Sequence, residues 1–135
     1  MQNTIQAIEV PDNLRLNFLP KYFKKYFFKA EHRIYSTLSK LASEYQGGYW
    51  NFFELSNGGF YMAPESDKSF LVYVQGNGYA GCLSPDAAGI VSCLLVINQL
   101  CWENPEDEKM IDQYYLLRDF ALEHVEANEI FGAID

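Results

Sequence analysis

The chain is poor in cysteine and in long apolar runs, and each shortage excludes a class of protein. Its three cysteines, Cys82, Cys93 and Cys101, form no CxxC pair and lie far in the sequence from both histidines. This pattern fits neither a disulfide framework nor a zinc site, so Cys93 and Cys101 are predicted to be small core residues. The longest apolar run, residues 90–97, is interrupted by Ser92 and is far shorter than the ~18 residues of a membrane span.

Basic residues are also scarce, with 10 Lys and Arg against 18 Asp and Glu, for a net charge of -8. A strongly cationic nucleic-acid binder is excluded for the chain as a whole, because phosphate contacts need clustered Lys and Arg. The first residues lack a basic segment followed by an apolar stretch, so no secretory signal is predicted. We therefore expect a cytoplasmic protein that binds neither DNA directly nor a membrane.

Apolar residues, in contrast, are abundant enough to build a core. They make up 49% of the 135 residues, and the chain carries ten Tyr, ten Phe and two Trp. Disorder is excluded, and a chain of this length should bury about two-thirds of its unfolded surface. No linker or repeat divides it, so residues 1–135 are predicted to form one domain, with residues 1–13 as a mostly polar lead-in.

The negative charge is concentrated at one end of the chain. Residues 1–60 hold seven basic and five acidic residues, whereas residues 61–135 hold three basic and thirteen acidic ones. Residues 103–135 alone carry ten acidic and two basic residues, and their net charge of -8 equals that of the whole protein. This asymmetry is the compositional feature that points to a partner.

Helical periodicity marks the first third of the chain. Pro20 is predicted to begin a helical region over residues 21–45, since proline at the first helical position loses no hydrogen bond. Apolar residues recur there at spacings of three, four and seven. The opposite face carries four lysines: Lys21, Lys24, Lys25 and Lys29. The region is either one helix or two helices with a break near residues 28–30.

Between residues 49 and 83 the period changes to two, which is typical of strands. The predicted strands are residues 49–55, 60–63, 70–75 and 79–83. An Asn57-Gly58 pair separates the first two, and this is the strongest short-range signal for a hairpin. We expect one small antiparallel sheet of three to four strands.

Two or three helices are predicted to complete the chain. Ser84-Pro85-Asp86 supplies a cap, a first-turn proline and an acid that complements the helix dipole. The helix that follows, to about residue 102, is apolar on nearly all sides and should be the central buried helix. Another runs from about residue 106 to 124, with a last short turn at 128–134. The order of elements predicts an α+β fold.

No motif in the chain supports catalysis. GxSxG and the phosphate loop are both absent. Residues 76–81 spell GxGxxG, but the next helix begins three residues too late for a dinucleotide site, so a structural turn is predicted. His32 and His124 are expected on exposed helical faces. We predict no catalytic residue, metal, cofactor or small-molecule substrate.

Two binding surfaces remain. The lysine face could serve a DNA- or regulator-binding module, although solvated lysines explain it as well. The acidic C-terminal helices could instead contact the basic groove of a DNA-handling enzyme by charge complementarity. A solvated helical face explains these acids too, and the basic first half argues against mimicry of DNA by the whole molecule.

Four blocks carry a resemblance to a known family: residues 47–64 (GGYWNFFELSNGGFYMAP), 76–79 (GNGY), 84–91 (SPDAAGIV) and 117–124 (LRDFALEH), the last leading to Ile134-Asp135. Together they resemble the ArdB/KlcA-type antirestriction proteins of plasmids and other mobile elements. The resemblance implies a compact α+β inhibitor of type I restriction-modification systems, with no known catalytic activity or cofactor.

The resemblance supplies no catalytic set, so the candidate site rests on the charge distribution. The expected partner is the type I restriction-modification complex or an accessory host protein. The candidate partner-binding residues are Asp119, Glu123, Glu126, Glu129 and Asp135. Reversal of Glu123, Glu126 and Glu129 to Lys is expected to abolish protection of unmodified phage DNA and to leave the fold intact.

Overall fold

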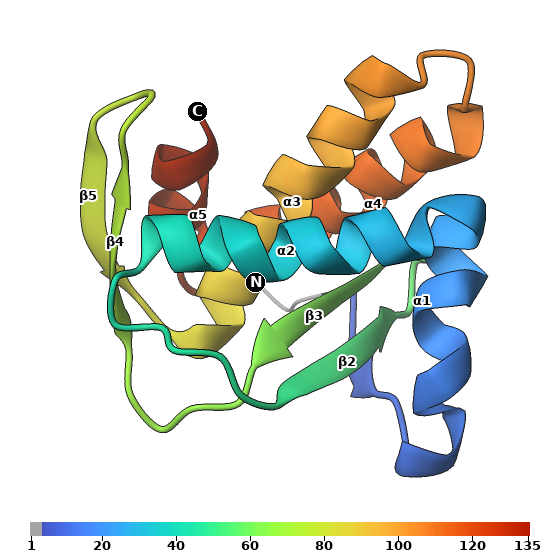
Figure 1. Ribbon diagram of the computed structural model, residues 1–135, viewed down its shortest axis with the longest axis horizontal. Helices are drawn as coiled ribbons and strands as arrows, with labels where there is room; N and C mark the ends of the chain where they lie inside the picture. Colours follow the sequence, from blue (N-terminus) through green and yellow to red (C-terminus); the bar gives the residue numbers. More distant parts are fainter. Residues whose placement is uncertain (1–3) are drawn as a thin grey trace.

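The computed structural model describes residues 4–135 as an α+β domain, as predicted (Figure 1). The strands are β1 Ala7–Glu9, β2 Trp50–Leu55, β3 Phe60–Pro64, β4 Phe70–Val74 and β5 Tyr79–Leu83. The α-helices are α1 Arg15–Phe23, α2 Phe27–Leu41, α3 Pro85–Glu103, α4 Glu108–Glu123 and α5 Ala127–Ile134. Single 3₁₀ turns lie at Asp12–Leu14 and Lys24–Tyr26.

The strands form two sheets, and the prediction of one sheet was wrong in this respect. β1, β2 and β3 form an antiparallel sheet in that order, and β4 and β5 form a separate hairpin. β1 lies within residues 1–13, for which only a lead-in was predicted, and it pairs Ala7 with Leu55. Residues 1–3 of that lead-in lie outside the described residues. Three residues are too few for a period-two pattern, so β1 depends on the edge that β2 offers.

The helical region after Pro20 also differs from the prediction. α1 begins at Arg15, so Pro20 lies inside the helix, and the break falls at the Lys24–Tyr26 turn. Burial explains the early start, because Phe18 stacks on Phe52 with ring centroids 4.6 Å apart. Lys24 ends α1 with a φ of 53°, a strained value for a residue other than glycine.

Both predicted hairpin turns are confirmed. In the β2–β3 turn, the Asn57 side chain accepts a hydrogen bond from the Gly59 N–H at 2.9 Å, and Gly58 has a φ of 94°. The GxGxxG segment forms the β4–β5 turn, where the Asn77 amide donates to the backbone oxygens of Gly132 and Ala133. The glycines of this segment therefore build a hairpin that is bound to α5.

α3 is the central buried helix, as predicted, and its start is also confirmed. The Ser84 hydroxyl accepts a hydrogen bond from the Ala87 N–H at 3.1 Å, and Pro85 occupies the first turn. α3 is long and apolar enough to span a membrane by length and composition, yet it packs against β3, α2 and α4. Cys93 lies in this core, as predicted, and burial raises the pKa of its thiol to about 12. Cys101 is half-buried.

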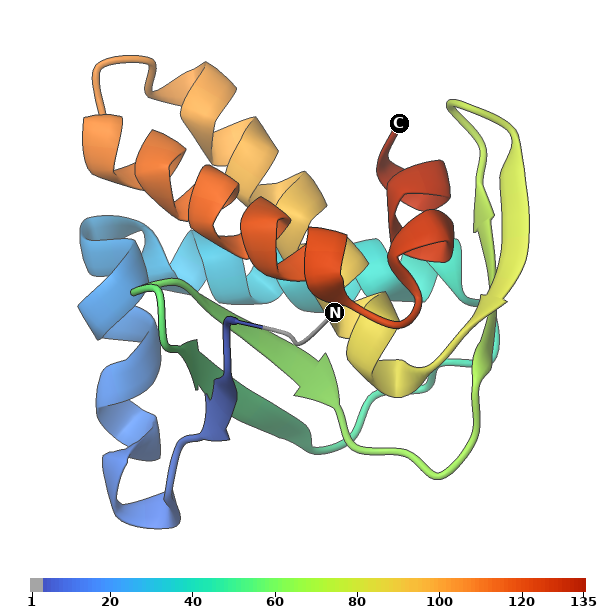
Figure 2. The same ribbon diagram turned by 180° about the vertical axis from the view of Figure 1, so that it is seen from behind.

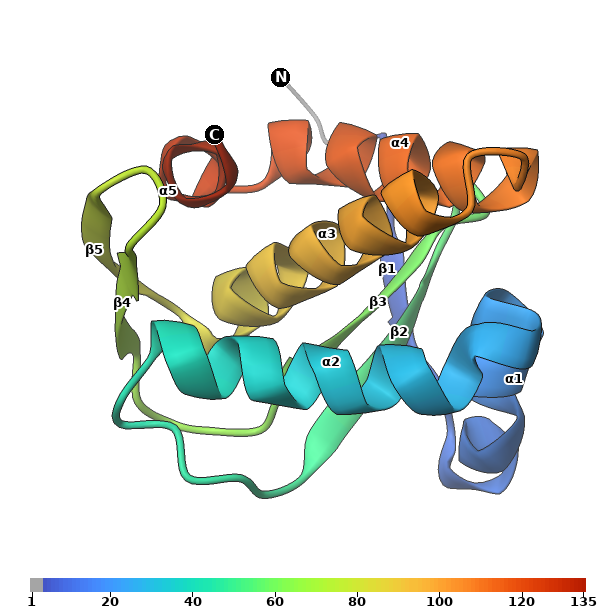
Figure 3. The same ribbon diagram turned by 45° about the horizontal axis from the view of Figure 1, so that its top comes forward.

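The remaining elements surround α3. α2 crosses one side of it, and α4 covers the opposite side, where it forms the outer layer of the molecule (Figures 1 and 2). The β4–β5 hairpin stands at one end beside α5, and α1 lies at the other end (Figure 3). The turn between α4 and α5 thus comes close to the start of α3.

Candidate functional site

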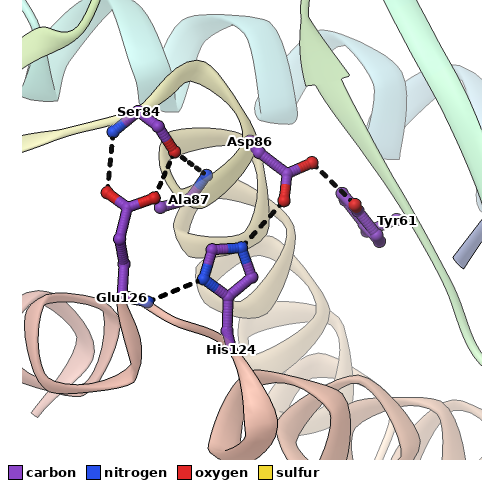
Figure 4. A network of polar contacts seen from close by, with 6 residues as sticks. All are labelled: Tyr61, Ser84, Asp86, Ala87, His124 and Glu126. Atoms are coloured by element: carbon purple, nitrogen blue, oxygen red, sulfur yellow. Dashed lines mark hydrogen bonds and ion pairs between the residues drawn. The ribbon is translucent and has the colours of Figure 1, made fainter. Parts of the chain in front are cut away.

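A network of polar side chains joins three distant parts of the chain at the start of α3 (Figure 4). Tyr61 comes from β3, Ser84 and Asp86 from the N-terminal end of α3, and His124 and Glu126 from the turn between α4 and α5. Four of these residues lie in the blocks that carry the family resemblance, at residues 47–64, 84–91 and 117–124. Segments that are far apart in the sequence therefore meet at this network.

Glu126 binds the residue that caps α3. Its carboxylate accepts a hydrogen bond from the Ser84 N–H at 2.9 Å and a second one from the Ser84 hydroxyl. The hydroxyl in turn accepts from the Ala87 N–H. A carboxylate at this place also complements the positive end of the α3 dipole. The partly buried Glu126 carboxylate is therefore held at the start of α3.

Asp86 accepts hydrogen bonds from two side chains. The Tyr61 hydroxyl donates at 2.7 Å, and His124 Nε2 lies 2.8 Å from the other carboxylate oxygen. His124 Nδ1 accepts from the Glu126 N–H at 2.9 Å, so its hydrogen-bond partners assign the proton to Nε2. Burial, followed by the Asp86 charge, raises the pKa of Tyr61 well above its ordinary range.

The network uses the hydrogen-bonding groups that catalysis would need. Both ring nitrogens of His124 have partners within the protein, and the Ser84 hydroxyl both donates and accepts. A general base must reach a substrate proton, and His124 offers no free nitrogen for this purpose in the arrangement observed. The geometry favours a structural role, in which the network fixes the α4–α5 turn to α3 and β3.

The prediction that His124 lies on an exposed face was wrong, because its side chain is only 10% exposed. His32 is exposed, as predicted. Local sequence indicated Asp86 only as a helix-start acid, and Tyr61 only as a strand residue. No pattern in the sequence linked these two residues to His124, because their contacts span 25 and 38 positions.

The five predicted partner-binding residues lie in two different environments. Glu123, Glu126 and Glu129 all bind groups within the protein. Glu123 accepts from the Thr4 N–H at 3.0 Å, the Thr4 hydroxyl at 2.7 Å and the Ile5 N–H at 3.1 Å. Glu129 accepts from the Tyr79 hydroxyl of β5. Reversal of these charges would break contacts to the segment before β1, to the start of α3 and to β5, so it would not test partner binding alone.

Asp119 and Asp135 are the predicted residues that remain available. Both are exposed, and neither side chain has a hydrogen bond or an ion pair with any residue from 4 to 135. Asp119 lies on α4, and Asp135 follows α5 at the end of the chain. A change of either carboxylate therefore breaks no hydrogen bond or ion pair among these residues.

The four lysines of the N-terminal region do not form one face. Lys21 pairs with Glu54 of β2 at 2.6 Å, whereas Lys29 lies 3.8 Å from Glu103 of α3. The turn at residues 24–26 rotates the second helix relative to the first and separates the two groups. The positive face predicted for a nucleic-acid contact is therefore divided and partly neutralised.

A metal site was not predicted, and the side chains of residues 4–135 contain no group of three or more His, Cys, Asp or Glu that could hold a metal ion. The pockets at the surface are open and bounded by mixed side chains. The one between α1 and α4 has a volume of about 400 Å³, and lysines and aspartates both line it.

Glu123 makes the attachment of the N-terminal segment sensitive to acid. The hydrogen bond from the Thr4 hydroxyl, followed by that from the Ile5 N–H, lowers the pKa of Glu123 below its ordinary value of 4.5. A lowered pKa in the folded state means that the attachment is fully present above pH 4.5 and is lost as the pH falls through the folded-state pKa. We expect the Ile5 amide signal in an NMR titration to inflect below pH 4.5.

The matched variant for this titration is Glu123→Gln, which keeps the size of the side chain and removes its charge. The Ile5 inflection should disappear in this variant, while signals from α3 remain unchanged. An inflection at or above 4.5 in the unmodified protein would contradict the assignment of these bonds to the ionised carboxylate.

The fold and the network define the chain as a small α+β protein in which polar side chains join β3, α3 and the α4–α5 turn, while other acids lie exposed on the surface. A family model described as "Antirestriction protein" matches residues 43–135. Two Escherichia coli relatives, both named antirestriction protein KlcA, are 46% and 42% identical to the chain. The alignments cover 97% of the chain in both cases, and 94% and 95% of the relatives. The chain belongs to the antirestriction protein family.

A solved structure is similar to the chain over its full length. The TM-score is 0.91 at 40% sequence identity, and the match covers 100% of this chain and 98% of the other. That structure is described as showing that the KlcA and ArdB proteins have a novel fold and antirestriction activity against type I DNA restriction systems in vivo but not in vitro. The predicted family and α+β fold class are therefore confirmed.

Proposed function

We propose that this chain protects incoming DNA of a mobile element by inhibiting a host type I restriction-modification system. The observation that carries the proposal is the full-length match to a structure of the KlcA and ArdB proteins, for which such activity is described. The likeness covers 100% of this chain and 98% of the other, at 40% identity and a TM-score of 0.91. The site of action is the cytoplasm, where incoming DNA meets the host restriction enzyme.

The chain acts by binding a protein rather than by catalysis. Support comes from the network at α3, whose histidine and serine are used within the protein. The alternative, a DNA- or regulator-binding module, has weaker support because Lys21 and Lys29 lie against carboxylates. The KlcA and ArdB proteins are described as active in vivo but not in vitro, which favours a target that is present only in the cell. This target is the restriction complex in its cellular state or an accessory host protein.

Efficiency of plating of unmodified phage on a restricting host tests this function. We expect expression of the chain to raise plating by tenfold or more. An inhibitor that acts by binding is used up by its target, so added copies of the restriction genes should lower the protection. Unchanged plating would contradict the function, and protection that excess target cannot titrate would contradict the binding mechanism.

Asp119 and Asp135 are the proposed contacts among the five predicted carboxylates. Reversal of both to Lys should weaken protection with little loss of stability, since both residues are exposed and neither carboxylate forms a hydrogen bond or ion pair with residues 4–135. The matched control is Asp67→Lys, which reverses an exposed acid in the β3–β4 loop. Equal protection by the double variant and the wild type would remove these two residues from the contact.

A further inference from the structure

The outer face of α4 carries an exposed stripe that packing within the protein does not explain. Its residues recur at spacings of four, three, four and three, which places them along one side of a helix. We call the following set the α4 outer stripe: Glu108, Asp112, Tyr115, Asp119 and Leu122. The opposite side of α4 buries Met110, Leu117 and Ala121 against the core. All five residues of the stripe are exposed, and among residues 4–135 no other helix or strand lies over this side of α4 (Figures 2 and 3).

The stripe exposes two large side chains that contain much apolar surface. Tyr115 is 56% exposed and Leu122 is 55% exposed, and Val125, three residues beyond Leu122, is 94% exposed. Burial of exposed apolar surface against a partner is favourable, so these side chains can contribute to binding. Tyrosine is also among the residues that most often dominate binding energy at protein interfaces.

The carboxylates of the stripe are unpaired. Within residues 4–135, Glu108, Asp112 and Asp119 form no ion pair, whereas Glu103, Glu123 and Glu126 bind groups of the protein itself. The two bases of α4 are not members of the stripe, and Arg118 lies over the Phe131 ring at 5.2 Å. The stripe therefore presents apolar surface bordered by carboxylates that form no ion pair, and of these Asp112 also lines the pocket between α1 and α4 that lysines share.

We propose, on the basis of the proposed function, that the α4 outer stripe is a docking surface for a basic protein partner. Tyr115 and Leu122 enter an apolar groove, and the three carboxylates meet Lys or Arg side chains at its rim. An amphipathic helix commonly binds a groove in this way, and complementary charge steers the encounter. Proteins that bind the phosphates of DNA carry such clustered bases, so a DNA-handling protein fits this surface.

Charge also distinguishes this partner from two other occupants. In a symmetric dimer the same patch occurs on both subunits, so three carboxylates would face three carboxylates. Like charges placed opposite one another oppose association. An anionic lipid surface attracts basic segments and would repel the stripe for the same reason.

Two variants separate the parts of the stripe. Tyr115→Ser with Leu122→Ser removes the apolar surface, and Asp112→Lys with Asp119→Lys reverses two charges. The matched control combines Leu16→Ser, where the leucine is 92% exposed, with Asp67→Lys. We expect each stripe variant to lower protection in the plating assay by about tenfold, the control to retain it, and all three to unfold at the wild-type temperature.

Photo-crosslinking from position 115 gives a second readout that does not depend on protection. A benzophenone side chain at 115 should crosslink, in restricting cells, to a peptide with net positive charge. The same probe at Tyr73, another exposed tyrosine, should not crosslink to this peptide, and Asp112→Lys with Asp119→Lys should abolish the crosslink. These results together support the basic partner.

The outcomes distinguish the docking surface from the proposed function. Wild-type protection that both stripe variants retain overturns the docking surface and leaves the function standing. If the wild-type chain gives no protection, the proposed function is overturned. The crosslink from position 115 then shows by itself whether the docking surface binds a basic partner. A crosslink to a second copy of the chain, to lipid or to an acidic peptide overturns the basic partner.

Discussion

Replacement of Gly89 by Ala is expected to destabilise the protein by about 3 kcal/mol, because overpacking of a core typically costs up to this amount. A Cβ atom at this position would lie 2.5 Å from both the Ala63 Cα and the Met62 carbonyl oxygen. Two of the three nearest atoms belong to the β3 backbone, so α3 itself must move away from the sheet. At this chain length the loss corresponds to a fall in Tm of about 10 °C.

The direction of the change in stability distinguishes close packing at Gly89 from open space. Glycine inside a helix is less favourable than alanine by about 1 kcal/mol, so Ala would stabilise α3 if the space existed. Thermal unfolding followed by circular dichroism measures the difference, and Gly76→Ala is the matched control. A Cβ at Gly76 would meet nothing within 4 Å, so its Tm should barely change. An increase in Tm for Gly89→Ala would show that α3 and β3 are not in such close contact.

Replacement of Asp86 by Ala should destabilise the fold by about 2 kcal/mol. The change leaves the buried Tyr61 hydroxyl and His124 Nε2 without their partner, and each unsatisfied group costs about 1–3 kcal/mol. It also removes the acid from the first turn of α3, worth about 0.3–1 kcal/mol. Because the Asp86 side chain is 41% exposed, water can replace part of the loss, and the expected value is kept at the lower end.

A double-mutant cycle in urea tests the network directly. Tyr61→Phe should destabilise the wild type, but it should be neutral or stabilising when Asp86 is already Ala, because the hydroxyl then has no partner. Asp67→Ala removes an exposed acid in a loop and should leave the free energy of unfolding unchanged. Additive losses at positions 61 and 86 would mean that their hydrogen bond contributes nothing to stability.

The elements predicted correctly are those that depend on neighbours in the sequence. The Asn57-Gly58 turn, the Ser84 cap and the apolar composition of α3 on nearly all sides are local features of the sequence, and each was confirmed. The α1–α2 region was predicted less well. Burial of Phe18 against Phe52 overrides the usual preference of proline for the first helical turn, and this contact spans 34 positions.

In the candidate site, too, local features were predicted from the sequence and long-range contacts were not. The charge distribution located the acids of the C-terminal third, yet it could not show which of them are free. Glu123 binds Thr4 across 119 positions, and Glu126 binds Ser84 across 42. A glutamate in such a contact and a solvated glutamate have the same local sequence, because hydrogen-bond partners at this separation leave no periodic signal.

The sequence by itself determined the fold class, the central buried helix and the resemblance to the antirestriction family, since all three follow from local patterns and ordered blocks. Only the tertiary structure decided the division into two sheets, the burial of His124 and the availability of Asp119. These features depend on which distant segments meet, and the hydrophobic effect that brings them together is non-directional. The acids of the C-terminal third therefore fall into two sets: one binds groups within the protein, and the other is exposed and is the set proposed to contact a partner.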